Sequence, residues 1–192
     1  MTLVLFCILA YFVGNLNFGM VWQYVLEGPD VRKLGSKNVG ASNVMRLYGK
    51  LPSLITFLGD ALKGALVVVC VRFFFDTSFD IYVASFCVLL GHIYPVLLRF
   101  HGGKGVATLL GVFYAWAWPV GLLCACVWVG VFVAKRIASL ASLTMCLVAP
   151  VLFLVIVDVM VGFAALSLCL VVLWAHRPNI KRLFQGREAT IT

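Results

Sequence analysis

Residues 35–46 alternate glycine and basic residues with serine and asparagine, a pattern suited to holding an anion. Glycine lets backbone N–H groups approach the anion, hydroxyl and amide side chains add donors, and a guanidinium adds charge. The same composition is typical of a solvated turn before a helix cap, and the residues alone leave both interpretations open. The polar side chains of interest in this segment are Ser36, Asn38, Ser42, Asn43 and Arg46.

A second pattern of this kind surrounds Lys104 with Gly102, Gly103 and Gly105, directly before an apolar run. A helix beginning there would place unpaired N–H groups and the positive end of its dipole beside the lysine. This is not a nucleotide-binding P-loop, because Gly105 stands where Ser or Thr should follow and Leu98 stands where the leading glycine should be. Three glycines also exceed what a turn requires, so we expect a phosphate site without a nucleotide.

The C-terminal tail predicts a short amphipathic helix at the membrane surface that ends near Phe184, because its apolar residues recur at helical spacing and a glycine follows. Lys181 and Arg182 are expected to contact anionic lipid. His176 and Asn179 lie at the membrane edge, where they either belong to the same anchor or reach a site.

Five further polar residues lie in or beside apolar runs. Asp60 and Lys63 are three residues apart, so they share a helix face and can pair. Such charges are functional candidates by default, but a structural ion pair neutralised against itself carries equal weight. We expect His92 to be structural, and Ser139 and Ser142 either cap a helix or donate to a phosphate.

Several familiar catalytic patterns are missing. No His-x4-Asp pair follows any histidine, and neither a G-x-S-x-G elbow nor an H-E-x-x-H metal motif occurs. The seven cysteines contain no CxxC pair, so we interpret them as apolar packing residues. We expect no cofactor, no metal ion and no nucleic-acid partner.

Composition places the chain in a membrane. It is 64% hydrophobic and 11% charged with a mean hydropathy of +1.09, against about 45–50% apolar and about 25% charged residues in soluble domains. The N-terminal apolar run lacks a preceding basic residue and a cleavage site, so we expect a retained helix and not a signal peptide. The length predicts one integral membrane domain over residues 1–192.

The apolar segments predict the spanning helices. A single helix over the 30 residues of 105–134 would be ~45 Å long, against a hydrocarbon core of ~30 Å. Residues 116–119 read Trp-Ala-Trp-Pro, which disfavours a continuous helix and favours a membrane interface, so we divide the segment into 105–117 and 118–134. The other predicted spans are 2–26, 52–75, 79–98, 137–157 and 159–175.

Charge supports this division. With seven spans, thirteen Lys and Arg residues fall in the first, third and fifth connections and the tail, and all lie on one side of the membrane. Basic residues favour the cytoplasm, so the N-terminus is expected outside and the C-terminus inside. The predicted fold is therefore an all-α polytopic bundle of seven transmembrane helices.

Seven short motifs, in order along nearly the whole chain, resemble those of the bacterial acyl-phosphate-dependent glycerol-3-phosphate acyltransferases. Each is weak alone, but seven in order at these spacings are specific. Two departures occur in the first motif, where Lys37 replaces the usual glycine and Ser42 replaces the usual threonine. The motifs are G-S-x-N-x-G-x-[ST]-N-x-x-R at 35–46, D-x-x-K-G at 60–64, G-H-x-Y-P at 91–95, G-G-K-G-x-A-T at 102–108, S-L-A-S at 139–142, H-R-x-N-I at 176–180 and G-R-E at 186–188.

The resemblance implies a seven-helix enzyme of the bacterial inner membrane whose site faces the cytoplasm. Its partners would be acyl phosphate, glycerol 3-phosphate and membrane lipids, and its product lysophosphatidic acid, an intermediate of phospholipid synthesis. We assign His176, Asn179 and Lys104 to catalysis, with either His176 or the donor's own phosphate as the base. The residues expected to hold substrate are Ser36, Asn38, Ser42, Asn43, Arg46, Gly102, Gly103, Lys104, Gly105, Ser142 and Glu188.

Two other functions compete with this one. A membrane transporter of a phosphorylated metabolite would share the phosphate-binding loops but needs a polar path across the bilayer. Apart from Asp60 and Lys63, the spans offer mainly Asn15 and Asn17, expected near the middle of the first helix, and we interpret these as packing amides. A non-catalytic lipid-binding protein would have no need of the glycine–lysine loop.

Overall fold

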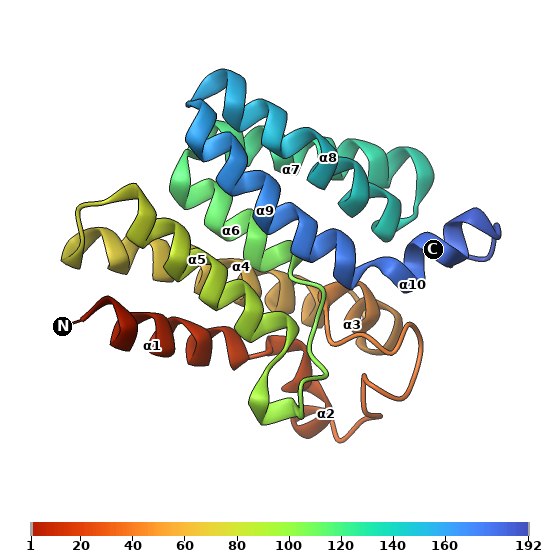
Figure 1. Ribbon diagram of the computed structural model, residues 1–192. Helices are drawn as coiled ribbons and strands as arrows, with labels where there is room; N and C mark the ends of the chain where they lie inside the picture. The colour runs from red at the N-terminus through yellow and green to blue at the C-terminus, as the bar shows by residue number, and fades with distance from the viewer. Residues whose placement is uncertain (1, 192) are drawn as a thin grey trace. The chain divides into compact units, whose positions relative to one another are not determined.

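The computed structural model describes residues 2–191, and every regular element within that range is a helix. This confirms the all-α prediction. The chain divides into two compact units, Met1–Ala115 and Trp116–Thr192, each of which is described by itself. Figure 1 shows the helices in chain order.

The first unit contains most of the predicted phosphate-binding residues. Its long helices are α1, α4 and α5, while short helices and loops fill the connections. The elements are α1 (Leu3–Asn15), η1 (Phe18–Met20), α2 (Trp22–Val25), α3 (Ala41–Tyr48), α4 (Lys50–Phe74), α5 (Ser78–Ile93), η2 (Val96–Leu98) and α6 (Val106–Trp116), whose last residue falls in the second unit.

The second unit is built from three long helices, the middle one packed against the other two, and a short terminal helix. The elements are α7 (Trp118–Lys135), α8 (Ala138–Ile156), α9 (Val159–Ala175) and α10 (Arg177–Phe184). Cys124, Cys146 and Cys169 are buried, one on each long helix, as expected of small packing residues. Helix α10 ends at Phe184, where the sequence predicted its end.

The predicted division of the long apolar segment is confirmed. Helix α6 ends at Trp116, Ala117 is extended, and α7 begins at Trp118 with Pro119 in its first turn. Proline is favoured there because the first N–H groups of a helix have no intrahelical partner to lose.

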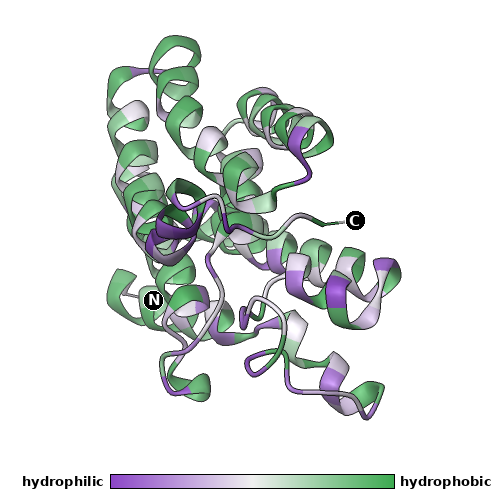
Figure 2. Cartoon of the chain, turned by 90° about the vertical axis from the view of Figure 1, so that its right-hand side faces the viewer, coloured by the Kyte–Doolittle hydropathy of each residue, from purple (hydrophilic) through white to green (hydrophobic). Residues whose placement is uncertain are grey.

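Most of the long helices have apolar outer surfaces that suit contact with lipid. Large apolar side chains remain exposed along them, and Figure 2 shows hydrophobic residues along the long helices and hydrophilic ones gathered in connections and short helices. By length and composition, five segments of the described chain can cross a membrane, or six if α9 and α10, bent by 64°, form one span. Helix α6, with 11 residues, is short for a crossing. Seven spans therefore stays a prediction.

The first predicted span was too long. Helix α1 ends at Asn15, so the placement of Asn15 and Asn17 near a helix middle was wrong. The Asn15 amide donates to the Tyr11 carbonyl at 2.7 Å and competes with the backbone ladder, and the Asn17 amide donates to the Asn15 carbonyl at 3.1 Å. The chain then turns through η1 and α2 instead of continuing to residue 26.

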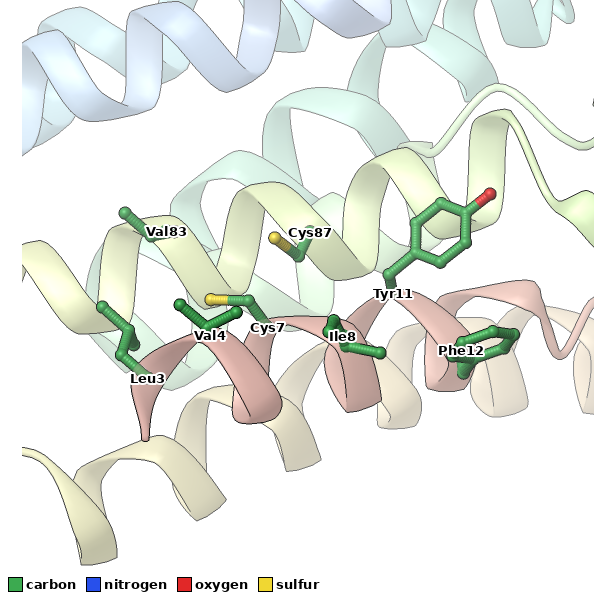
Figure 3. Close-up of a pocket in the computed structure, with 8 residues that line it drawn as sticks. All are labelled: Leu3, Val4, Cys7, Ile8, Tyr11, Phe12, Val83 and Cys87. Atoms are coloured by element: carbon green, nitrogen blue, oxygen red, sulfur yellow. The ribbon is translucent and has the colours of Figure 1, made fainter. Parts of the chain in front are cut away.

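Helices α1 and α5 lie side by side (Figure 1) and approach closely through Gly14 and Gly91. A Cβ on Gly14 would overlap the Val88 carbonyl oxygen and lie 2.9 Å from the Gly91 Cα, so only glycine allows this separation. Nearer the helix starts, an apolar groove of about 570 Å³ runs between the two helices (Figure 3). Exposed Val4 and Ile8 line it, which suits contact with lipid acyl chains.

Candidate functional site

The first predicted phosphate loop has a small core of its own. Val31, Val39 and Val44 are buried against Met20, with Leu98 packed on the same cluster. This core seats the loop between α2 and α3. Because Leu98 lies in η2, just before the glycine–lysine loop, the two predicted phosphate loops are both tied to one cluster of the first unit.

Asn43 organises this loop from within. It is fully buried, and its Oδ1 accepts from the Ser36 N–H at 2.8 Å. Its Nδ2 donates to the carbonyls of Val31 and Leu34 at 2.8 and 3.1 Å. Both ends of the amide therefore hold backbone, which fixes the path of the segment that carries Ser36 and Asn38.

Lys37 adopts a backbone conformation that favours glycine. Its φ of 57° lies in the left-handed region, which costs a residue with a Cβ about 1–2 kcal/mol. Glycine adopts this conformation without that cost, which fits its being the usual residue at this position. Ser42 and Arg46 follow on α3, with Arg46 exposed.

The glycine–lysine loop lies against the end of α5. The N–H of Gly102 donates to the Ile93 carbonyl at 3.2 Å and the N–H of Gly103 to the His92 carbonyl at 3.1 Å. A Cβ on Gly102 would overlap the His92 carbonyl oxygen. From the sequence, only a phosphate-binding role was predicted for these glycines. The structure shows that close packing of the loop against α5 also requires them. Lys104 follows, and α6 begins two residues later.

Lys63 and Asp60 form the predicted ion pair, with Nζ 2.8 Å from Oδ1 and both side chains buried. The ammonium does more than neutralise the carboxylate. It donates to the carbonyls of Gly14 and Leu16 at 3.1 and 2.5 Å, at the end of α1, and its Nζ lies 2.9 Å from Nδ1 of His92. Lys63 thus fastens α1, α4 and α5 together, a role that sequence spacing did not reveal.

In the second unit, Glu188 joins the tail to the helices. Its Oε1 accepts from the Ser139 hydroxyl at 2.7 Å and from the Asn179 Nδ2 at 2.5 Å. Its Oε2 accepts from Arg182 Nε at 2.6 Å. Arg182, expected only at the lipid surface, is therefore also half of an ion pair. Burial by itself raises the pKa of Glu188, but these three donors outweigh it and hold the pKa below its ordinary value.

His176 lies at the bend between α9 and α10. Pro178 has no N–H to continue the α9 ladder, so the chain turns and α10 begins at Arg177. The ring is buried, and its Nδ1 is 2.8 Å from the Val172 carbonyl oxygen. A carbonyl can only accept, so the neutral ring carries its proton on Nδ1 and its lone pair on Nε2.

The interpretation of Ser139 and Ser142 as helix caps was wrong. Helix α8 starts at Ala138 after Ile137, and no side chain caps it. Ser142 donates to the Ala138 carbonyl at 2.8 Å and accepts from Trp128 Nε1 at 3.0 Å. Donation of these hydroxyls to a phosphate stays a prediction. Among residues 2–191, no three His, Cys, Asp or Glu side chains are grouped to hold a metal ion.

The fold and these clusters define an integral membrane protein that is helical throughout its described residues, with clusters of buried polar side chains on its helices and glycine-containing loops beside them. The sequence profile described as glycerol-3-phosphate acyltransferase matches residues 4–186. The glycerol-3-phosphate acyltransferase of Gluconobacter oxydans is 40% identical, over 98% of this chain and 93% of that protein. The one from Methylococcus capsulatus is 41% identical, over 95% of this chain and 92% of its own.

Solved structures agree with these relatives. A crystal structure of PlsY (YgiH), an integral membrane glycerol 3-phosphate acyltransferase, in its glycerol 3-phosphate form matches with a TM-score of 0.92 and 40% identity, over 99% of this chain and 96% of that one. Its lysophosphatidic acid form matches with a TM-score of 0.90 and 39% identity, over 99% of this chain and 95% of that one. The chain belongs to the glycerol-3-phosphate acyltransferase family. It is an acyltransferase, which decides against the transporter.

We predict that the Glu188 cluster makes the fold sensitive to acid. Since the folded pKa of Glu188 is lowered, its contribution to stability is complete above the ordinary value of 4.5 and is lost as the pH falls through the lower folded pKa. Glu188→Gln should therefore lower the thermal midpoint at neutral pH and do so progressively less as the pH falls below the ordinary value of 4.5. A gap between wild type and variant that stays constant over this range would contradict the assignment.

Proposed function

We propose that this enzyme takes its acyl group from an acyl phosphate and transfers it to the 1-hydroxyl of glycerol 3-phosphate. The products are lysophosphatidic acid and inorganic phosphate, and the reaction belongs to phospholipid biosynthesis. Membership of the acyltransferase family carries the proposal. The glycine–lysine loop at the start of α6 supports it, because a helix N-terminus with a lysine beside it suits a phosphate.

The chemistry needs charge neutralisation and one proton acceptor. The attacking hydroxyl oxygen forms a bond to the acyl carbon, the bond from that carbon to the donor's phosphate oxygen breaks, and phosphate leaves with the electron pair. Acyl phosphate is a mixed anhydride, so cations on its phosphate make departure easy. Most of the catalysis then comes from holding two anions in register.

The proposed residues fall in both units, and each group is described within its own unit. In the first, the loop held by Asn43 and the loop seated on α5 provide phosphate donors. In the second, Glu188 holds Asn179 and Ser139 in place near His176 and Ser142. The proposed phosphate-binding residues are Ser36, Asn38, Ser42, Arg46, Gly102, Gly103, Lys104, Gly105 and Ser142, with Asn43 and Glu188 positioning them.

We propose a topology of seven spans, with the N-terminus outside and the tail in the cytoplasm. The alternation of basic connections supports it, as does the break between α6 and α7. On this topology the phosphate-binding residues face the cytoplasm of a bacterial inner membrane, and residues 1–192 act as one acyltransferase domain. Membrane lipids surround the helices, and Lys181 on α10 contacts anionic headgroups.

The donor is tested by assaying the purified protein in detergent with labelled glycerol 3-phosphate. We expect palmitoyl phosphate to give labelled lysophosphatidic acid, and palmitoyl-CoA in a parallel tube to give none. Lys104→Ala should lower the rate with palmitoyl phosphate, and Lys104→Arg, which keeps the charge, should retain more of it. Product from palmitoyl-CoA alone would refute the proposed donor.

We propose His176 as the general base, because Nε2 carries the lone pair when Nδ1 donates to Val172. His176→Ala is then expected to lower kcat at saturating substrates by roughly 10²–10⁴-fold. Circular dichroism and thermal unfolding provide the control for folding. If His176→Ala raises KM and leaves kcat unchanged, the donor's own phosphate is the base and the protein contributes positioning alone.

A further inference from the structure

His92 and Gly103 fit together with no space between them. A Cβ on Gly103 would overlap Nε2 of His92 and lie 2.9 and 3.0 Å from its Cε1 and Cδ2, and these ring atoms are its three nearest neighbours. The loop is tied to the same turn by the hydrogen bond from the Gly103 N–H to the His92 carbonyl, at 3.1 Å. Gly103, the residue before Lys104, therefore packs directly against the imidazole ring of His92.

The ring has one orientation. Its Nδ1 is 2.9 Å from Lys63 Nζ and 3.6 Å from Asp60 Oδ1. The Nδ1 edge of the ring therefore faces the ion pair, and the Nε2 edge faces Gly103. At 3% exposure the ring has no open space to turn into. The buried ion pair thus fixes the imidazole, and the imidazole in turn limits the position of the loop.

We propose that His92 is a positioning residue for Lys104. Held by Lys63 and Asp60, its ring sets where the Gly102–Gly105 backbone runs and so where the ammonium of Lys104 meets a substrate phosphate. The inference rests on the proposed phosphate-binding role of this loop. His92 touches no reacting atom in this role and acts only through the backbone of Gly103.

The neighbouring glycine provides a matched control. A Cβ on Gly102 would overlap the backbone oxygen of His92 and Pro95 Cδ and lie 2.7 Å from the Ile93 oxygen, and no ring atom of His92 is among these three nearest atoms. No side-chain substitution at His92 can relieve that overlap. A Cβ on Gly103, in contrast, meets the imidazole, so a smaller side chain at position 92 makes room for it.

The test is a double-mutant cycle on kcat and on KM for both substrates. Gly103→Ala should displace the loop and lower kcat/KM about tenfold or more for the substrate that Lys104 holds. His92→Asn keeps an acceptor near the Nδ1 position for Lys63 but removes Nε2 and Cε1, and alone it should lower kcat/KM several-fold. The double variant Gly103→Ala/His92→Asn should be more active than Gly103→Ala.

Two results would overturn the proposal. One is a double variant whose loss equals the product of the two single losses, as expected for independent sites. The other is equal rescue of Gly102→Ala by His92→Asn, which would point to general loosening of the fold. If Gly103→Ala does not fold, recovery of folded protein in the double variant tests the same contact by size-exclusion chromatography. An inactive wild type would instead count against the proposed function.

Discussion

The buried ammonium of Lys63 is the interaction on which the first unit depends. A charge inside the hydrocarbon region is costly unless it is paired and hydrogen-bonded, and Lys63 meets both conditions with Asp60, two carbonyls of α1 and His92. The same contacts explain why α1 can end early. The carbonyls of Gly14 and Leu16 receive donors from α4, so the chain is able to leave the helix within an apolar environment.

The second unit applies the same principle with the opposite charge. The carboxylate of Glu188 accepts hydrogen bonds from a hydroxyl, an amide and a guanidinium, and so ties the end of the tail to α8 and α10. In each unit, one charged side chain holds several polar groups in place, and some of these groups are distant in sequence. In the proposed reaction both substrates carry phosphate, and such order would have a direct use there, because catalysis by positioning requires donors that do not move when the anions arrive.

Sequence reasoning succeeded where one local signal decided the outcome. Two tryptophans followed by Pro119 located the break in the long apolar segment, the apolar spacing with Gly186 located the end of the tail helix, and the spacing of Asp60 and Lys63 gave their pairing. It failed where the answer lay in distant contacts. The end of α1 depends on a lysine 47 residues from Leu16, and the partner of Ser139 is a glutamate 49 residues away. No pattern within a single helix encodes either contact, and the packing role of the loop glycines was hidden for the same reason.

The dependence of the fold on Lys63 is tested most directly by the thermal unfolding midpoints of Lys63→Met, Asp60→Asn and the double variant in detergent. Because Lys63 also contacts Gly14, Leu16 and His92, Lys63→Met should lower the unfolding midpoint more than Asp60→Asn does. For the same reason, adding Asp60→Asn to Lys63→Met should restore little of the loss. A double variant as stable as the wild type would contradict this, since it would show that the two charges only neutralise each other.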